Sequence, residues 1–366
     1  MDTDRLAFSF VRFADSECRR QPLYDAICRI AAGHPAILDL MRGTAAEQRR
    51  PNLLLAAVHE LVLAGTAHAL AQYFPSVGGS RPADAALAGH LVDFCRLNEV
   101  ALRQRMSTRA TQTNEIGRCT VLWPLLRHLS ASTGRKKLAL LDVGCSAGLN
   151  LGVDHYHYDY GELQLGAAPG PAVPQIVCTL LGKGRPSASG PEPSIVCRMG
   201  IDPAPINIFD DEAVRWLRAC LWPNDSVRRE RMDRAITLAR EQRWPVQQHA
   251  DCSAAAVSWA ESLPADVLPV IFNSWVLTYF NAAALARHLA LMQALVQRCG
   301  AAWISAEEAR LRIGDEVVPA LPDTADAEHR SGTLWALMLP GQQRPHTTVL
   351  ARSHAHGHWL EWLGNN

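Results

Sequence analysis

Four residues that can serve a ligand, Asp142, Gly144, Ser146 and Gly148, alternate in the segment LLDVGCSAGLNL. The apolar residues before them predict a buried strand that ends at the aspartate, followed by a tight turn and a helix. Glycines in such a turn let the backbone approach a ligand closely, and the free amides at a helix start favour an anionic group. We therefore expect the segment from Asp142 to Asn150 to bind a cofactor.

The spacing D-x-G-x-S-x-G resembles motif I of the class I S-adenosylmethionine-dependent methyltransferases, whereas a dinucleotide fingerprint would read G-x-G-x-x-G. The resemblance implies a Rossmann-like sheet and a turn that holds the methionine part of S-adenosyl-L-methionine. It also implies contacts from three later strand ends. Asp202 in RMGIDPAP would hold the ribose hydroxyls, Asp251 in HADCS would contact adenine, and Asn273 lies in VIFNSWVLTYF, which resembles the fourth motif.

This resemblance implies an enzyme that transfers a methyl group to an acceptor, which we expect to be a small molecule. The sequence identifies neither the methylated atom nor a catalytic residue, because a general base is needed only for a hydroxyl or a protonated amine. Two alternatives stay open. One is a protein that binds a nucleotide without catalysis, and the other is a hydrolase.

The hydrolase alternative arises because GCSAG also satisfies G-x-S-x-G, the nucleophile elbow of the α/β-hydrolases. Ser146, Asp251 and a C-terminal histidine such as His356 follow the order of a hydrolase triad. An elbow requires several strands before it, however, and only helices are predicted upstream. Asp142 also has a place in the methyltransferase turn and none in an elbow.

The segment RATQTNEIGR places two arginines, Arg109 and Arg118, just before the first predicted strand. A solvated polar surface would explain such a run equally well. In class I methyltransferases the corresponding segment often folds over the cofactor, where an arginine can pair with the methionine carboxylate. The resemblance therefore implies that Arg109 and Arg118 contribute to the cofactor site.

No metal site is expected. His354, His356 and His358 alternate and would share one face of an extended strand, as zinc ligands sometimes do. No nearby cysteine or carboxylate completes a familiar set of ligands, and Gly357 predicts a bend. A role for HAHGH in a pocket or on the surface is the preferred interpretation.

Four segments, RATQTNEIGR, GCSAGLNL, RMGID and HAHGHWLEW, are similar to those of an uncharacterised bacterial family, domain of unknown function 2332. This similarity extends over nearly the whole chain. It implies membership of that family and brings no activity with it.

The elements that must position these residues change in character near residue 136. Before it, helical patterns predominate, for example over Pro51–Phe74, Ala85–Met106 and Cys119–Ser130. After it, strand and helix patterns alternate, which predicts an α/β fold with a mostly parallel sheet and an antiparallel C-terminal hairpin. We therefore expect a helical N-terminal domain over 1–135 and an α/β domain over 136–366.

Gly144 and Asp202 are 58 residues apart, whereas the usual gap between such motifs is ~20 residues. The difference predicts an insertion at about 155–193. Its part from Gly161 to Pro193 is rich in glycine, proline and serine, which predicts a loop with at most a short strand. We interpret this part as a lid over the cofactor.

The composition describes a globular protein of 366 residues, in which 36 basic residues balance 36 acidic ones. Zero formal charge argues against nucleic acid or an anionic membrane as the main partner. The ten cysteines include no C-x-x-C pair, and the N-terminus lacks a signal sequence, so a cytoplasmic location is expected. The oligomeric state is not predicted.

Overall fold

The computed structural model describes residues 3–187, 192–309, 311, 313 and 332–364. The chain forms two compact units. The first unit contains residues 1–113 and 207–230, and the second contains 114–206 and 231–366. Residues 114–135, which were expected to belong to the helical N-terminal domain, thus belong to the second unit.

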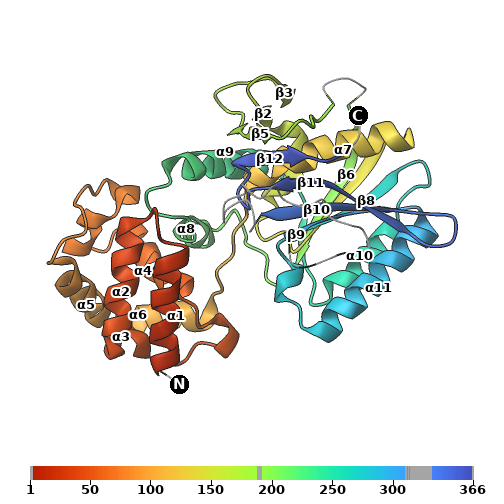
Figure 1. The fold of residues 1–366 in the computed structure, drawn as a ribbon. Helices are drawn as coiled ribbons and strands as arrows, with labels where there is room; N and C mark the ends of the chain where they lie inside the picture. The colour runs from red at the N-terminus through yellow and green to blue at the C-terminus, as the bar shows by residue number, and fades with distance from the viewer. Residues whose placement is uncertain (1–2, 188–191, 310, 312, 314–331, 365–366) are drawn as a thin grey trace. The chain divides into compact units, whose positions relative to one another are not determined.

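The first unit is helical (Figure 1). Its α-helices are α1 (Thr3–Ser16), α2 (Pro22–Gly33), α3 (Pro35–Asp39), α4 (Pro51–Leu63), α5 (Leu87–Leu97), α6 (Glu99–Thr108) and α8 (Asp211–Ala219). The helix predicted over Pro51–Phe74 is shorter in the structure, and the one predicted over Ala85–Met106 is divided into two. Helix α4 ends near Gly65, which has a φ of 84°, and Asn98 separates α5 from α6.

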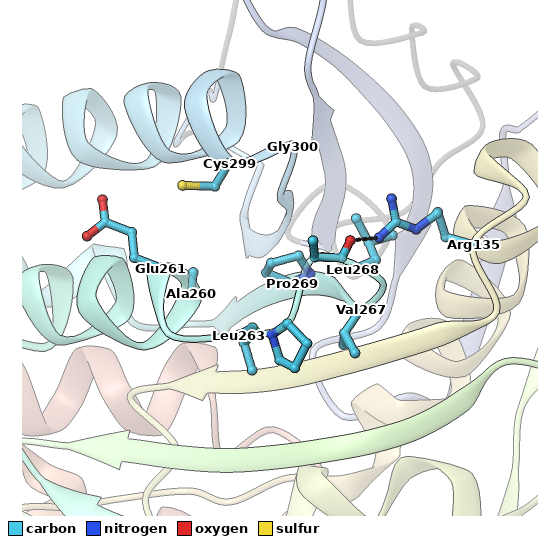
Figure 2. A pocket seen from close by; sticks show the side chains of 11 residues that line it. Arg135, Ala260, Glu261, Leu263, Val267, Leu268, Pro269, Cys299 and Gly300 are labelled. Atoms are coloured by element: carbon cyan, nitrogen blue, oxygen red, sulfur yellow. Dashed lines mark hydrogen bonds between the residues drawn. The ribbon is translucent and has the colours of Figure 1, made fainter.

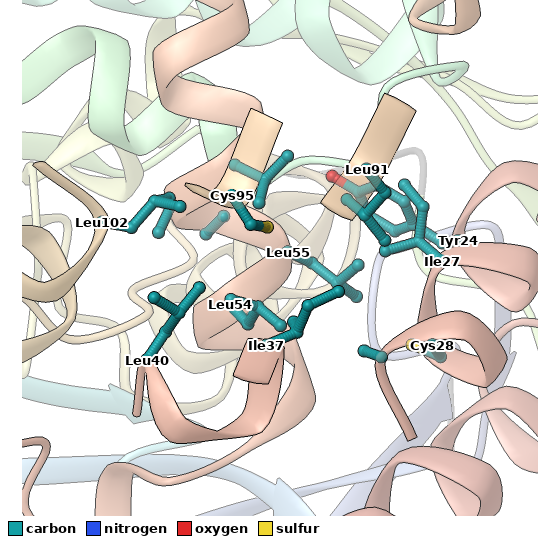
Figure 3. Packing of buried hydrophobic residues seen from close by; sticks show 14 of the residues in the cluster. Tyr24, Ile27, Cys28, Ile37, Leu40, Leu54, Leu55, Leu91, Cys95 and Leu102 are labelled. Atoms are coloured by element: carbon teal, nitrogen blue, oxygen red, sulfur yellow. The ribbon is translucent and has the colours of Figure 1, made fainter. Parts of the chain in front are cut away.

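Helix α4 forms the centre of this unit because it is apolar on almost every side. Figure 3 shows Leu54 and Leu55 among the side chains of the cluster, together with Tyr24 and Ile27 from α2. Glu60 is also buried on α4, and its carboxylate binds both Arg105 of α6 and Arg215 of α8. A buried charge of this kind requires such partners.

The second unit is built on a nine-stranded sheet (Figure 1). Five parallel strands lie in the order β7 (Val246–Gln248), β6 (Ser194–Asp202), β1 (Lys137–Val143), β8 (Leu268–Ser274) and β9 (Ala302–Glu308). The antiparallel strands β10 (Thr333–Leu339), β11 (His346–Ser353) and β12 (Trp359–Trp362) continue the sheet, and β5 (Thr179–Leu181) pairs in parallel with β12. A mixed α/β fold with a mostly parallel sheet is thereby confirmed.

Helices cover both faces of this sheet (Figure 1). On one face α10 (Cys252–Glu261) and α11 (Ala282–Cys299) pack against alternate residues of the central strands, such as Leu141, Val143 and Ile271. Helix α7 (Cys119–Thr133) lies on the other face. Side chains alternate between the two faces of a sheet along a strand. Because Leu141 and Val143 point toward α10 and α11, Asp142 between them points toward the face covered by α7.

The predicted insertion contains more structure than a loop. The segment after β1 is a 3₁₀ helix, η5 (Leu149–His155), where an α-helix was expected. Strands β2 (His157–Asp159), β3 (Gln164–Gly166) and β4 (Gln175–Val177) then form a separate three-stranded sheet. Three buried tyrosine hydroxyls attach this region to backbone carbonyls of η5 and α7, namely those of Tyr156, Tyr158 and Tyr160. Residues 188–191 lie outside the described part.

No helix among the described residues is long and apolar enough to cross a membrane.

Candidate functional site

The turn after β1 has an unusual backbone conformation. Gly144, Ser146 and Gly148 have φ values of 72°, 53° and 69°, in the left-handed region that favours glycine. The amides of Gly144 and Cys145 both donate to the carbonyl of Ile201 in β6, at 2.8 and 3.2 Å. The chain therefore turns back sharply over the end of the neighbouring strand.

Asp202, the last residue of β6, holds this turn with its side chain. Its Oδ2 accepts a hydrogen bond from the amide of Ser146 at 2.9 Å, and its Oδ1 accepts one from the amide of Ala204 at 2.8 Å. The carboxyl group is buried. The structure thus brings together Asp202 and the predicted cofactor turn, which are far apart in the sequence.

The glycines of the turn lie against protein side chains. A Cβ atom on Gly144 would lie 2.4 Å from Cγ2 of Val276, and one on Gly148 would lie 2.6 Å from Cγ2 of Val246. Both distances are too short for a real contact. The glycines therefore allow the loop after β8 and the first residue of β7 to pack closely against the turn.

Asp142 is fully buried beside this turn. Burial raises the pKa of its carboxyl group to about 8, the charge of Asp202 adds to the rise, and Arg118 and a hydrogen bond from Asn150 oppose it. Its Oδ2 has no hydrogen-bond partner among the described residues. A buried oxygen in this state is costly unless a donor or a cation reaches it.

The segment Asn114–Arg118 covers the start of η5. The Oδ1 atom of Asn114 accepts a hydrogen bond from the amide of Leu149 at 2.8 Å, and Cys119 donates to Oδ1 of Asn150 over 3.5 Å. The second half of the segment RATQTNEIGR therefore contacts the start of η5, directly after the turn. The contact made by Asn114 was not predicted.

Arg118 connects the turn region to two other loops. Its Nε donates to the carbonyl of Ala355 at 3.1 Å, and its Nη1 donates to Oγ of Ser274 at 2.9 Å. Burial raises the pKa of both Asp142 and Glu307, and the charge of the buried Arg118 guanidinium opposes this rise. Arg118 is therefore the cation of a buried polar cluster at the carboxyl ends of β1, β8 and β9.

Asn273 and Glu307 form the next part of this cluster. The side-chain Nδ2 of Asn273 donates to Oε1 of Glu307 at 2.7 Å, while its Oδ1 accepts from Nε1 of Trp303 at 2.6 Å. The same Oε1 accepts from the amides of Val276 and Leu277. Burial raises the pKa of Glu307, and its Oε2 has no partner among the described residues. Asn273 thus supports the loop after β8.

Glu307 was not predicted as a site residue. The signal was present, because AAWISAE places an acid at the carboxyl end of an apolar strand next to the strand that ends at Asn273. An acid in that position of a buried strand needs partners or a ligand.

Asp251 lies at the start of α10 and is largely exposed. Its Oδ1 accepts from the amide of Ala254 at 3.0 Å, and a salt bridge of 2.7 Å to Arg287 lowers its pKa. Asp251 also lines an open groove of about 500 Å³ together with His249 and Trp259. It is therefore both a helix cap and part of a groove beside β6 and β7.

Arg109 belongs to the first unit. Its guanidinium forms an ion pair with Glu212 and lies over the ring of Trp216, 5.4 Å from the ring centre. These contacts stabilise α8 within the helical unit.

The HAHGH turn joins β11 to β12 and lies beside Asn114–Arg118. The rings of His354 and His358 stack with centres 4.2 Å apart, and Nδ1 of His356 lies 3.5 Å from Oε2 of Glu115. Within the described residues, no three histidine, cysteine or acidic side chains form a metal-binding group. The proximity of Glu115 to His356 was not predicted.

A smaller hollow of about 280 Å³ lies at the opposite edge of the sheet, where the parallel strands begin. Figure 2 shows it between Arg135, Leu268 and Gly300, with a hydrogen bond of 2.8 Å from Arg135 to the carbonyl of Ala265. Ligands of parallel α/β sheets bind at the carboxyl ends of the strands. The turn after β1 is therefore the better candidate site.

Comparison with known proteins gave one family. No curated protein and no solved structure matched the chain significantly. The model of the family described as "Uncharacterized protein conserved in bacteria (DUF2332)" matches residues 7–362. With nearly its whole length matched, the chain belongs to this DUF2332 family.

Proposed function

We propose that this protein is an S-adenosylmethionine-dependent methyltransferase that acts on a small-molecule acceptor. The observation that carries the proposal is the hydrogen bond between Asp202, at the end of β6, and the amide of Ser146 in the turn after β1. Two acids at the carboxyl ends of adjacent parallel strands, Asp142 as the next-to-last residue of β1 and Asp202 as the last of β6, thereby meet at one glycine-rich turn. This is the arrangement that the resemblance to class I methyltransferases implies.

The order of the parallel strands supports the proposal. In chain order, β1, β6, β7, β8 and β9 are first to fifth, so the sheet order β7-β6-β1-β8-β9 reads 3-2-1-4-5. This is the order of a Rossmann-type sheet, in which the nucleotide binds at the carboxyl ends of the strands, where the order reverses. Here the reversal lies between β1 and β8, at the turn and the Arg118 cluster.

The residues at this edge fit the polar groups of the cofactor. The Oδ2 atom of Asp142, which has no hydrogen-bond partner in the described part of the chain, suits the ammonium of the methionine part, and Arg118 suits its carboxylate. Each oxygen of Asp202 accepts one backbone amide and retains capacity for one ribose hydroxyl. We also assign Asp251 and its groove to the adenine end.

When bound, the cofactor supplies a methyl group on a sulfonium, which already activates it for transfer. The protein then has to hold the acceptor in line and exclude water. Val276 and Val246, which pack against the glycines of the turn, provide apolar surface beside it. Arg118 and Glu307 hold the loop after β8, which the fold places next to the turn.

Calorimetry with the purified protein tests the proposal. S-adenosylmethionine and S-adenosylhomocysteine should bind, and NAD should not. Asp202→Ala should weaken binding at least ~10-fold, since a charged hydrogen bond contributes ~1.5–3 kcal/mol. The matched control is Asp266→Ala, which removes an exposed acid paired with Lys137 at the start of β1 and should leave the affinity unchanged. Wild-type protein that binds neither ligand at millimolar concentration would exclude the function.

One observation favours the hydrolase alternative, namely the left-handed φ of 53° at Ser146, because an elbow serine occupies a strained turn. The other members of the suggested triad, however, contact different groups. Asp251 pairs with Arg287, and His356 lies against Glu115. A fluorophosphonate probe should therefore give no adduct. Labelling that is lost in Ser146→Ala would support the hydrolase instead.

A further inference from the structure

The HAHGH turn is locked against the segment Asn114–Arg118 by direct backbone contact. A Cβ atom on Gly357 would lie 2.0 Å from the carbonyl oxygen of Gly117, and one on Gly117 would lie 2.1 Å from the carbonyl oxygen of His356. Arg118 adds a hydrogen bond to Ala355 at 3.1 Å. The position of this turn is therefore set by the segment that also contacts the turn after β1.

The Glu115 side chain is held so that one of its carboxylate oxygens faces the HAHGH turn. Its Oε1 accepts from the amide of Gly117 at 2.8 Å and binds Arg231, whose guanidinium also donates to the carbonyl of His356. Its Oε2 lies 3.5 Å from Nδ1 of His356. The Glu115 side chain is 3% exposed and that of His356 is 30% exposed. A buried, fixed carboxylate thus lies beside a partly accessible imidazole.

This pairing has a chemical consequence. A carboxylate at Nδ1 favours the tautomer with the proton on Nδ1, orients the ring, and stabilises the imidazolium that forms when Nε2 takes a proton. Such distances are often long before substrate binds. Among the described residues, the charged or titratable groups near His356 also include Arg118, Arg231, His354 and His358.

The pair also lies close to the candidate cofactor site. Arg118 bonds to both Ala355 of the HAHGH turn and Ser274 at the end of β8. Asn114, one residue before Glu115, bonds to Leu149 of the glycine turn. One short segment therefore connects the imidazole to the end of the turn after β1 and to the end of β8, both of which belong to the proposed cofactor site.

We propose that His356, oriented by Glu115, is the catalytic base and that the acceptor is therefore a hydroxyl compound or a protonated amine. This inference rests on the proposed function. The acceptor's O–H or N–H⁺ proton passes to Nε2 of His356, and the lone pair left on oxygen or nitrogen bonds to the methyl carbon. The carbon–sulfur bond breaks and its electron pair stays on sulfur, which leaves a neutral thioether. The imidazolium then releases its proton to water.

Carbethoxylation by diethyl pyrocarbonate, mapped by mass spectrometry at pH 8, tests where His356 lies. S-adenosylmethionine at ten times its Kd should slow acylation of His356 about tenfold, because only the unliganded fraction reacts. Exposed His346 at the start of β11 is the internal reference and should react at an unchanged rate, which corrects for reagent consumed by the ligand. In Asp202→Ala, whose Kd should be at least ~10-fold higher, the same ligand concentration should slow acylation of His356 by no more than about twofold.

Glu115→Gln tests the orientation of the ring. Without the carboxylate, acylation of His356 in the unliganded protein should slow, whereas Glu361→Gln, which removes an acid paired with Arg352, should have no effect. Thermal unfolding of each variant shows whether it is folded. An unchanged rate in a folded Glu115→Gln protein would refute the orienting role.

Methyl transfer to catechol, used as a hydroxyl probe, adds a catalytic readout. Any turnover should fall about 100-fold or more in His356→Gln, the typical contribution of a general base, while calorimetric affinity for S-adenosylmethionine is retained. Retained turnover in that variant would overturn the proposal. Without turnover, the acylation test decides: unprotected His356 in protein that binds S-adenosylmethionine refutes the base and leaves the proposed function intact. If the wild-type protein does not bind S-adenosylmethionine, both the catalytic base and the proposed function are refuted.

Discussion

The buried carboxyl group of Asp142 should make the stability of the protein depend on pH in an uncommon direction. Burial raises its pKa from 3.8 to about 8 in the folded protein. Below pH 4 the group is protonated in both the folded and the unfolded state. Between about pH 4 and 8 the unfolded state ionises while the folded state keeps its proton, so this group's contribution to stability is lost as the pH rises.

Asp142→Asn removes this dependence because the amide resembles the protonated acid and does not titrate. Each pH unit in the window changes the free energy of unfolding by ~1.36 kcal/mol for one fully coupled group. From pH 5 to pH 7 the variant should therefore gain up to about 3 kcal/mol relative to the wild type. The charge of Asp202 contributes to the shift, so the two acids titrate as a coupled pair and 3 kcal/mol is a ceiling.

Urea unfolding followed by tryptophan fluorescence measures this difference, since Trp303 and Trp335 lie in the core of the same unit. The midpoint of Asp142→Asn relative to that of the wild type should rise steadily from pH 5 to pH 7. Asp266→Asn is the matched control, because that acid is exposed and its pKa is lowered by Lys137. If the difference in unfolding midpoint between wild type and Asp142→Asn stayed constant from pH 5 to pH 7, Asp142 would be ionised in the folded protein.

Two further substitutions test the packing. Glu60→Ala should lower the free energy of unfolding, measured in urea, by about 3–5 kcal/mol, because it leaves two part-buried arginines without their shared carboxylate. The control Glu212→Ala removes a half-exposed acid and should cost less than about 1 kcal/mol. Equal losses in the two variants would contradict the stronger role of the buried carboxylate. Gly144→Ala should lower stability by more than Gly134→Ala, since both have left-handed φ but only Gly144 has Val276 in the way. Gly134→Ala should cost about 1 kcal/mol from backbone strain alone. Similar urea-unfolding midpoints for Gly134→Ala and Gly144→Ala would show that Val276 moves aside at little cost.

Much of the second unit could be predicted from the sequence, because apolar runs and helix periods specify elements locally. The alternation of strand and helix patterns after residue 136 predicted the mostly parallel sheet and the antiparallel C-terminal hairpin, which β10 and β11 form. Long helical patterns were less reliable. The predicted helix Ala85–Met106 is interrupted at Asn98, which bonds back to the carbonyl of Phe94 and ends α5.

Part of the candidate site could also be predicted from local patterns. Acids that follow apolar strands mark strand ends, and parallel strand ends meet at one edge, so the proximity of Asp142 and Asp202 followed from the pattern. The pairing of Glu115 with His356 did not follow. It depends on how the turn after β11 packs against a segment before β1, and no local pattern encodes such a contact.

The hydrogen bond from Ser146 to Asp202 also affects how the site assembles during folding. It closes a chain segment of 56 residues, and closure entropy rises by only ~0.6 kcal/mol for each doubling of loop length. The sheet of β2, β3 and β4 forms within this segment and shortens the flexible length that remains to be closed. The glycine turn should therefore acquire its shape only when β6 docks beside β1. A peptide that contains the turn without β6 should lack that shape.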